Sequence, residues 1–326
     1  MGVSLFKKEK GYVMCLACNH YCKILEGKTG ICGVRKNVNS SLVLLVYGKI
    51  ASWNADPIEK KPLYHFLPST NTFSIGTIGC NFKCIFCQNY EISQEKDIFG
   101  EEFSPREIVE KAIKAECSSI AYTYNEPTIF LEFALDCAKI AKKKGIKNVL
   151  VTNGYMSKEA ILLCKNYIDA MNIDLKSFSD KFYQEMCGAK LLPVLNTIRE
   201  AHRMRIWIEI TTLLIPGKND SEEELTNIAK FIASVDKNIP WHISRFFPMY
   251  KMKDEKPTEI ISLQRAFEIG KKYLNYVYLG NLEDESDTFC PKCKNLLIKR
   301  IGYNITSFLV NGRCSKCHKR IEGVFQ

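Results

Sequence analysis

The chain has 326 residues, of which 46% are hydrophobic and 25% charged, and its formal net charge is +10. This composition is typical of a soluble globular protein with a substantial core. No run approaches the roughly 18 apolar residues of a membrane span, and residues 1–10 lack the apolar core of a signal peptide, so no membrane association and a cytoplasmic location are expected. The positive charge suits an anionic partner without selecting one.

Fifteen cysteines are the most informative part of the composition. Eleven of them form three clusters, which in a long chain of this expected location indicate metal binding rather than disulfides. We assign no chemistry to the four single cysteines, which we expect to be small buried apolar side chains: Cys117, Cys137, Cys164 and Cys187.

The first cluster defines a Cys-rich metal-binding segment over residues 1–70. Its spacing, Cys15-x2-Cys18-x3-Cys22-x9-Cys32, is compact enough for one metal ion, with His20 as a substitute ligand. Zinc is the expected metal, and an auxiliary iron–sulfur cluster and free thiols are the alternatives. An apolar run at 42–46 predicts a strand, and prolines at 57, 62 and 68 predict a loop-rich linker at the end of the segment.

The second segment, residues 71–283, alternates strand-like runs with helical patterns. Strands are predicted at 72–75, 119–123, 148–151, 170–174, 206–214, 241–246 and 276–279. Capping-box patterns predict helices that begin after Ser104 and Ser221, and a third helix is expected over 127–144, ending at Gly145. This alternation predicts parallel βαβ units, hence an α/β fold with either a doubly wound sheet or a barrel.

A loop directly after the first of these strands carries Cys80, Cys84 and Cys87 in the spacing C-x3-C-x2-C. Three thiolates on one short loop can bind three irons of a [4Fe-4S] cluster and leave the fourth iron open to a chelating ligand. An incomplete zinc site or three structural thiols are the alternatives, but zinc normally takes four protein ligands or three and a water. The next 29 residues contain no cysteine that could complete such a site.

The loop resembles that of the radical S-adenosylmethionine (SAM) superfamily. Residues 74–80 and 88–90, with 56–63 and 122–128, resemble the AmmeMemoRadiSam-system radical enzymes, which are related to the activating enzymes of pyruvate formate-lyase. The resemblance extends from residue 15 to about residue 279. It implies a partial (β/α)6 TIM-like barrel. It also implies that SAM binds the open iron through its amino and carboxylate groups, and that one electron cleaves it to methionine and a 5′-deoxyadenosyl radical.

Further motifs follow the predicted strands at their carboxyl ends, where α/β folds assemble their sites. Asn125-Glu126-Pro127 resembles the superfamily's Gly-Gly-Glu motif, although Tyr124-Asn125 replaces the two glycines. The resemblance implies that Glu126 binds the methionyl ammonium of SAM, and a helix-start glutamate is the structural alternative. Thr152-Asn153-Gly154 resembles a ribose- and carboxylate-contacting motif of the activating enzymes; a plain turn is its alternative.

Three more positions complete the cofactor contacts that we expect. Asp174-Leu175-Lys176 matches an Asp-x-Lys motif of the activating enzymes, and strand alternation places both charged residues on one side, either at the cofactor or as a structural ion pair. Phe86 precedes the third cysteine of the loop and is expected at the cofactor. His242 is a candidate for the cofactor or substrate side, with a satisfied core histidine as the alternative.

The last cluster has the spacing of a zinc ribbon, Cys290-x2-Cys293-x20-Cys314-x2-Cys317, in a small module over residues 284–326. Four thiolates form a closed zinc site that can fold a module with little core of its own. A second iron–sulfur cluster is the alternative. Several lysines and arginines of the module weakly favour an anionic partner.

The sequence therefore predicts a radical SAM enzyme that abstracts hydrogen from a protein or peptide substrate, as a glycyl-radical activating enzyme does. Modification of a nucleic acid such as tRNA is the first alternative, and a metal-binding adaptor without turnover is the second. The expected electron donor is a reductase, flavodoxin or ferredoxin. By resemblance alone, Memo-like and AMMECR-like proteins are candidate partners.

Overall fold

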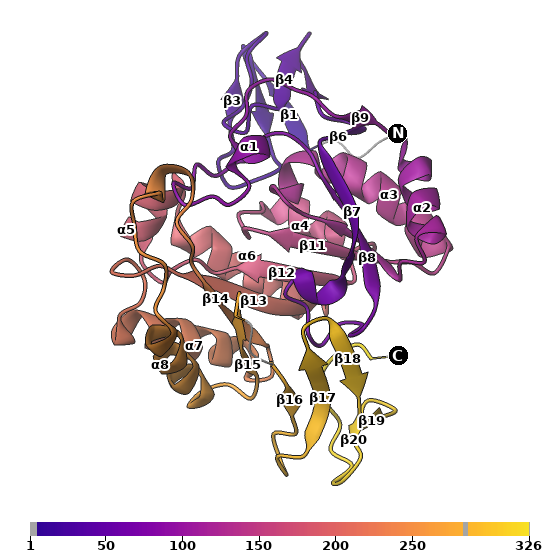
Figure 1. The fold of residues 1–326 in the computed structure, drawn as a ribbon. Helices are drawn as coiled ribbons and strands as arrows, with labels where there is room; N and C mark the ends of the chain where they lie inside the picture. Colours follow the sequence, from indigo (N-terminus) through magenta and orange to yellow (C-terminus); the bar gives the residue numbers. More distant parts are fainter. Residues whose placement is uncertain (1–4, 283–285, 326) are drawn as a thin grey trace.

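The computed structural model describes residues 5–282 and 286–325. Its centre is an eight-stranded sheet of order β15-β14-β13-β12-β11-β10-β8-β7 (Figure 1). Seven strands are parallel: β8 (Asn71–Gly76), β10 (Ser119–Tyr122), β11 (Lys147–Thr152), β12 (Ala170–Asp174), β13 (Trp207–Leu214), β14 (Trp241–Arg245) and β15 (Val277–Gly280). β7 (Ser52–Pro57) lies antiparallel to β8 at one edge. The parallel strands are largely buried, as expected when both faces of a sheet are covered.

Helices connect the parallel strands and pack along the outside of the sheet (Figure 1). The longer ones are α2 (Pro105–Lys114), α3 (Leu131–Lys143), α4 (Lys158–Cys164), α6 (Leu191–Arg203), α7 (Glu222–Asp236) and α8 (Ile260–Lys271). Shorter turns are η1 (Ile58–Lys60), α1 (Tyr90–Ser93), η2 (Pro127–Phe130), α5 (Asp180–Phe182), η3 (Tyr183–Cys187) and η4 (Tyr250–Met252). The predicted α/β partial barrel is confirmed, and its seven parallel strands correspond to the seven strands predicted over 72–279.

Local sequence signals explain where the helices begin and end. Ser104 accepts a hydrogen bond from the Glu107 amide, and the Glu107 carboxylate accepts one from the Ser104 amide, so the predicted capping box is present. Ser221 likewise caps α7 through the Glu224 amide. The second half of that predicted box is wrong, because the Glu224 carboxylate binds the hydroxyl of Ser177 instead.

The N-terminal segment forms small sheets at the top of Figure 1. β1 (Phe6–Glu9), β2 (Tyr12–Cys15) and β3 (Lys23–Ile24) make one sheet, β4 (Arg35–Val38) pairs with β5 (Ser41–Leu44), and β6 (Lys49–Ile50) pairs with β9 (Glu101–Glu102). The strand predicted at 42–46 corresponds to β5, shifted by one to two residues. Residues 52–57, expected to lead into a linker, form β7 of the central sheet instead.

The C-terminal module lies at the opposite end of the molecule in Figure 1. It contains β16 (Thr288–Phe289), β17 (Leu296–Ile301), β18 (Asn304–Ser307), β19 (Leu309–Val310) and β20 (Arg313–Cys314). Tyr276, directly before β15, and Tyr278, within it, share a buried apolar cluster with Leu297 and Ile298 of β17, so the module packs directly on the edge of the sheet. Within the described ranges, no helix is long and apolar enough to cross a membrane. The division into three segments at about residues 70 and 283 stays a prediction.

Candidate active site

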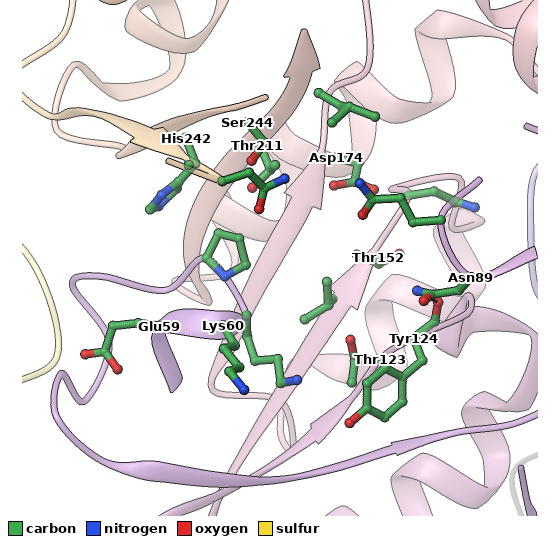
Figure 2. A pocket seen from close by; sticks show the side chains of 18 of the residues that line it. Glu59, Lys60, Asn89, Thr123, Tyr124, Thr152, Asp174, Thr211, His242 and Ser244 are labelled. Atoms are coloured by element: carbon green, nitrogen blue, oxygen red, sulfur yellow. Dashed lines mark hydrogen bonds between the residues drawn. The ribbon is translucent and has the colours of Figure 1, made fainter. Parts of the chain in front are cut away.

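A cavity of about 870 Å³ opens at the carboxyl ends of the parallel strands (Figure 2). Residues of seven successive strands and of the loops after them line it, as expected for a site of an α/β barrel. Every side chain predicted for the cluster loop or the cofactor lines this one cavity: Cys80, Cys84, Phe86, Cys87, Asn125, Glu126, Thr152, Asn153, Asp174, Lys176 and His242.

The three-cysteine loop is held in place by backbone contacts from two sides. Gly79 adopts a φ of +92°, which suits glycine, and its carbonyl accepts a hydrogen bond of 2.8 Å from the Asn125 side chain. On the other side, the Lys83 amide donates to the Cys187 carbonyl at 2.8 Å. The three cysteines, which all line the cavity, therefore sit on a braced loop. Their role as ligands of an iron–sulfur cluster stays a prediction.

Asn125 has a different immediate role from the one its motif suggests. Its Oδ1 accepts from the Thr77 amide at 3.2 Å, and its Nδ2 donates to the Thr77 hydroxyl and the Gly79 carbonyl. The amide is thus committed to the chain that leads into the cysteine loop. A cofactor contact through Asn125 stays a prediction.

Glu126 organises the next strand end. It is 2% exposed, and its carboxylate accepts hydrogen bonds from the Thr152 hydroxyl and the Asn153 amide, both at 2.7 Å, and from the Thr128 amide at 3.0 Å. Burial raises the pKa of this carboxyl, while these donors act in the opposite direction. Glu126 therefore fixes the turn after β11 and leaves little of its surface free in the cavity.

Asn153 connects that turn to the cysteine loop. Its Nδ2 donates to Oδ1 of Asn81 at 2.8 Å, and its own Oδ1 accepts from the Tyr155 amide at 3.0 Å. Gly154 follows with a φ of +72°, and a Cβ there would approach Ile173 to 2.8 Å, so the turn requires glycine. The predicted motif thus occurs as a tight turn that contacts Asn81, the residue after Cys80.

Asp174 and Lys176 form an ion pair of 2.7 Å at the end of β12. Both side chains face the cavity, as strand alternation predicts, and the Lys176 ammonium lies 5.8 Å from the centre of the Phe86 ring. The pair places one carboxylate and one ammonium next to the cysteine loop, a suitable combination for a zwitterionic ligand.

His242 lies on the other side of the cavity from Asn89 and Tyr124 (Figure 2). Its Nε2 is 2.7 Å from the carboxylate of Glu209, which is fully buried and also accepts from the Tyr64 and His65 amides. Donors around Glu209 lower the pKa of its carboxyl despite its burial. His242 is therefore held rigidly at the far wall.

Two groups of cavity residues were missed by the sequence reasoning. The segment around Asp56 contributes a buried ion pair with Lys61 at 2.9 Å, and Tyr124 donates to the same carboxylate at 3.1 Å. The C-terminal module contributes Arg300 and Tyr303 to the wall. The charged residues at 56–61 are a sequence signal that could have identified the first group. Arg300 could not be assigned from the sequence, because only tertiary packing brings the module to the cavity.

The two flanking quartets differ in spacing. In the C-terminal one, the four sulfurs all lie within 4.8 Å of one another, with Cys290–Cys317 and Cys293–Cys314 distances of 3.6 Å. The N-terminal four line a second, small buried cavity. Among the described residues, neither they nor the three cavity cysteines contain three sulfurs that mutually approach so closely.

Comparisons with known proteins agree on one family. Residues 74–231 match the Radical SAM superfamily. The chain is 42% identical over 325 residues to an uncharacterized protein of Methanocaldococcus jannaschii, with 97% of each chain covered. It is 30% identical over 217 residues, 64% of this chain and 80% of the relative, to a protein of the same organism that is provisionally named a glycyl-radical enzyme activating enzyme. This chain belongs to the radical SAM superfamily.

Other radical SAM relatives and a solved structure are more distant. Pyruvate formate-lyase 1-activating enzyme of Escherichia coli K12 is 21% identical over 214 residues, 60% of this chain and 86% of that one. SuiB of Streptococcus suis bound to SAM matches with a TM-score of 0.53 and 15% identity, over 69% of this chain and 53% of SuiB. At that identity the match shows the fold alone. Membership makes this protein an enzyme whose cofactors are a [4Fe-4S] cluster and SAM.

Proposed function

We propose that this radical SAM enzyme binds its [4Fe-4S] cluster through Cys80, Cys84 and Cys87 and directs the radical derived from SAM at a protein or peptide substrate. The observation that carries the proposal is the convergence of these three thiols with the polar side chains after β10, β11 and β12 on one cavity. When bound, the cluster supplies the single electron that cleaves SAM.

The residues around the cysteine loop suit the polar part of SAM. Asp174 and Lys176 offer opposite charges to the methionyl ammonium and carboxylate, and the Thr152–Asn153 turn offers polar atoms to the ribose. Glu126 and Asn125 act indirectly: Glu126 fixes the turn after β11, and Asn125 fixes the cysteine loop. His242 and Glu209 belong to the opposite wall, where we place the substrate.

The choice of a protein or peptide substrate is supported by the relatives that are named as activating enzymes. Such an enzyme would need a one-electron donor of the flavodoxin or ferredoxin type, and the Memo-like and AMMECR-like proteins remain candidate partners. For the C-terminal module we propose a structural zinc ion. Its support is the 3.6 Å separation of paired sulfurs, since zinc–sulfur bonds of about 2.3 Å place tetrahedral thiolates about 3.8 Å apart.

The test is anaerobic iron reconstitution followed by dithionite, with 5′-deoxyadenosine as the measured product. We expect product from the wild-type protein and from Cys117→Ala, a matched control outside the three cysteine clusters, and a loss of about 100-fold or more for Cys84→Ala. A Cys84→Ala variant that retains full product formation would refute the ligand assignment. Salt-dependent binding of tRNA, without a glycyl radical on any added protein, would favour the nucleic acid alternative.

A further inference from the structure

The N-terminal cysteines have a geometry that differs from that of a zinc site. Cys15, Cys18, Cys22 and Cys32 surround a small buried cavity, yet no three of their sulfurs lie mutually within 4.8 Å in the described chain. One zinc ion would hold four thiolates about 3.8 Å apart, as the C-terminal quartet does. A cubane cluster places each thiolate on its own iron and so keeps the sulfurs further apart.

In the described chain, the sulfurs of Cys80, Cys84 and Cys87 likewise do not all lie within 4.8 Å of one another. The superfamily assigns a [4Fe-4S] cluster to that kind of loop. The structure thus contains one thiol set whose close spacing matches zinc and two sets without such close spacing. One of these two sets lies in the region that matches the radical SAM superfamily. The N-terminal quartet resembles the iron–sulfur loop and differs from the C-terminal quartet.

The N-terminal quartet also lies directly against the cysteine loop. A Cβ on Gly79 would come within 2.5 Å of the Cys32 carbonyl oxygen, which shows how closely the two backbones approach. His20 Nε2 lies 2.9 Å from the Asn81 carbonyl oxygen, and Cys18 forms a β-bridge with Met156 behind the Thr152–Asn153 turn. The N-terminal segment is therefore packed on the cavity's cofactor end.

Asn81 lies between the two cysteine sets and carries an unmatched donor. Its Oδ1 accepts from Asn153, whereas its Nδ2 is buried and has no partner among the described residues. The residue is 1% exposed and lines the small cavity together with the four N-terminal cysteines. A buried amide N–H without an acceptor costs free energy. The sulfurs of an iron–sulfur cluster can accept a hydrogen bond from such a donor.

A buried cation completes the surroundings of this cavity. Arg35 is 1% exposed, lines the cavity and donates to the carbonyl of Ile129 at 2.9 Å and to the carboxylate of Glu132. A guanidinium at this place favours anionic thiolate ligands. Its positive charge stabilises anionic thiolates in this buried position, whichever metal binds there.

We propose that Cys15, Cys18, Cys22 and Cys32 hold a second [4Fe-4S] cluster, which passes electrons to the SAM-cleaving cluster. One electron leaves a reduced flavodoxin-type carrier, reduces the N-terminal cluster, and moves on to the cluster at Cys80, Cys84 and Cys87, so that the N-terminal cluster returns to its resting charge. The relay rests on the proposed function, whereas the metal assignment does not.

Metal content and Mössbauer spectra of anaerobically prepared protein test the assignment. We expect about eight irons and about one zinc per chain, and about four irons in a triple variant with Cys80→Ala, Cys84→Ala and Cys87→Ala. About four irons and two zincs in the wild-type protein would overturn the assignment and leave the SAM-cleaving site untouched. The wild-type measurement decides the question even if the triple variant does not fold.

The relay has its own test in a Cys18→Ala, Cys22→Ala variant, with Cys117→Ala as the matched control. We expect this variant to lose about half of its iron and to lose 5′-deoxyadenosine formation driven by reduced flavodoxin, while dithionite still supports it. Equal loss with both reductants, or no loss with flavodoxin, would overturn the relay.

Discussion

The two cysteine quartets offer the same four thiols and are built differently. The four sulfurs of the C-terminal quartet lie within 4.8 Å of one another in a small module. In the described chain, no three sulfurs of the N-terminal quartet do so, and this quartet contacts the cysteine loop of the active site. Each is docked by a buried arginine: Arg35 donates to the Glu132 carboxylate at the start of α3, and Arg300 donates to the Tyr64 carbonyl at 2.9 Å. Sulfur spacing and neighbouring groups, rather than the number of cysteines, are the grounds on which we propose zinc for one quartet and an iron–sulfur cluster for the other.

The largest effect is expected from a variant that disrupts only the C-terminal cysteine site. Cys314→Ser should abolish zinc binding and unfold the module, because structural zinc contributes about 10 kcal/mol or more to the folding of such small units. Zinc content and limited proteolysis within residues 286–325 measure this effect. Iron content should be unchanged; a loss of iron in this variant would show that the two quartets are not independent.

Replacing the two docking arginines should affect stability unequally. Arg35→Met leaves the Glu132 carboxylate without its cation and should cost about 3–5 kcal/mol. Arg300 is held by carbonyl and hydroxyl acceptors rather than a carboxylate, so Arg300→Met should cost about 2–3 kcal/mol. Urea unfolding of both variants checks the order, and a larger cost for Arg300→Met would contradict it.

Acid should weaken the contact of the C-terminal module. Burial lowers the pKa of His65 to about 4 from its ordinary value of about 6.5, and its ring contacts the Glu322 carbonyl and the Tyr278 hydroxyl. Because the unfolded chain takes up the proton first, stability should fall from about pH 6.5 and lose about 3 kcal/mol by about pH 4. Unfolding free energies across this range test it, and His65→Gln should flatten the slope.

The smallest expected effect concerns the contact between the N-terminal segment and the cysteine loop. Gly79→Ala introduces a Cβ at positive φ against the Cys32 carbonyl, whereas Gly145→Ala meets positive φ with nothing within 4 Å. Both variants should lose about 1–2 kcal/mol of unfolding free energy, because alanine disfavours this backbone conformation. Gly79→Ala should lose more because of the contact with the Cys32 carbonyl. Thermal unfolding compares them, and equal losses would mean that the contact is not tight.

Much of the central fold could be predicted from the sequence. The strand predicted at 170–174 has the bounds of β12, and the other predicted strands of the sheet differ from the observed ones by at most one residue at either end. Strong apolar runs between helical patterns explain this success, because both faces of the sheet are covered. β7 was missed because its run, SWNADP, includes polar residues and a proline, which an edge strand tolerates.

The site was predictable only where residues lie next to one another in the sequence. The motifs after β8, β10, β11 and β12 were found because they follow strand ends, whereas Arg300 of the C-terminal module reaches the same cavity by tertiary packing alone. The hydrogen-bond partners of individual side chains could not be predicted from the sequence either. Neither the bond between His242 and Glu209 nor the orientation of Glu224 follows from spacing.

Electron paramagnetic resonance of dithionite-reduced protein, recorded with and without SAM, tests the central claim most directly. If the cluster at Cys80, Cys84 and Cys87 has an open iron, SAM should change its signal, and this change should persist in the Cys18→Ala, Cys22→Ala variant and vanish when the three loop cysteines are replaced. A reduced wild-type signal that SAM leaves unaltered would contradict the account.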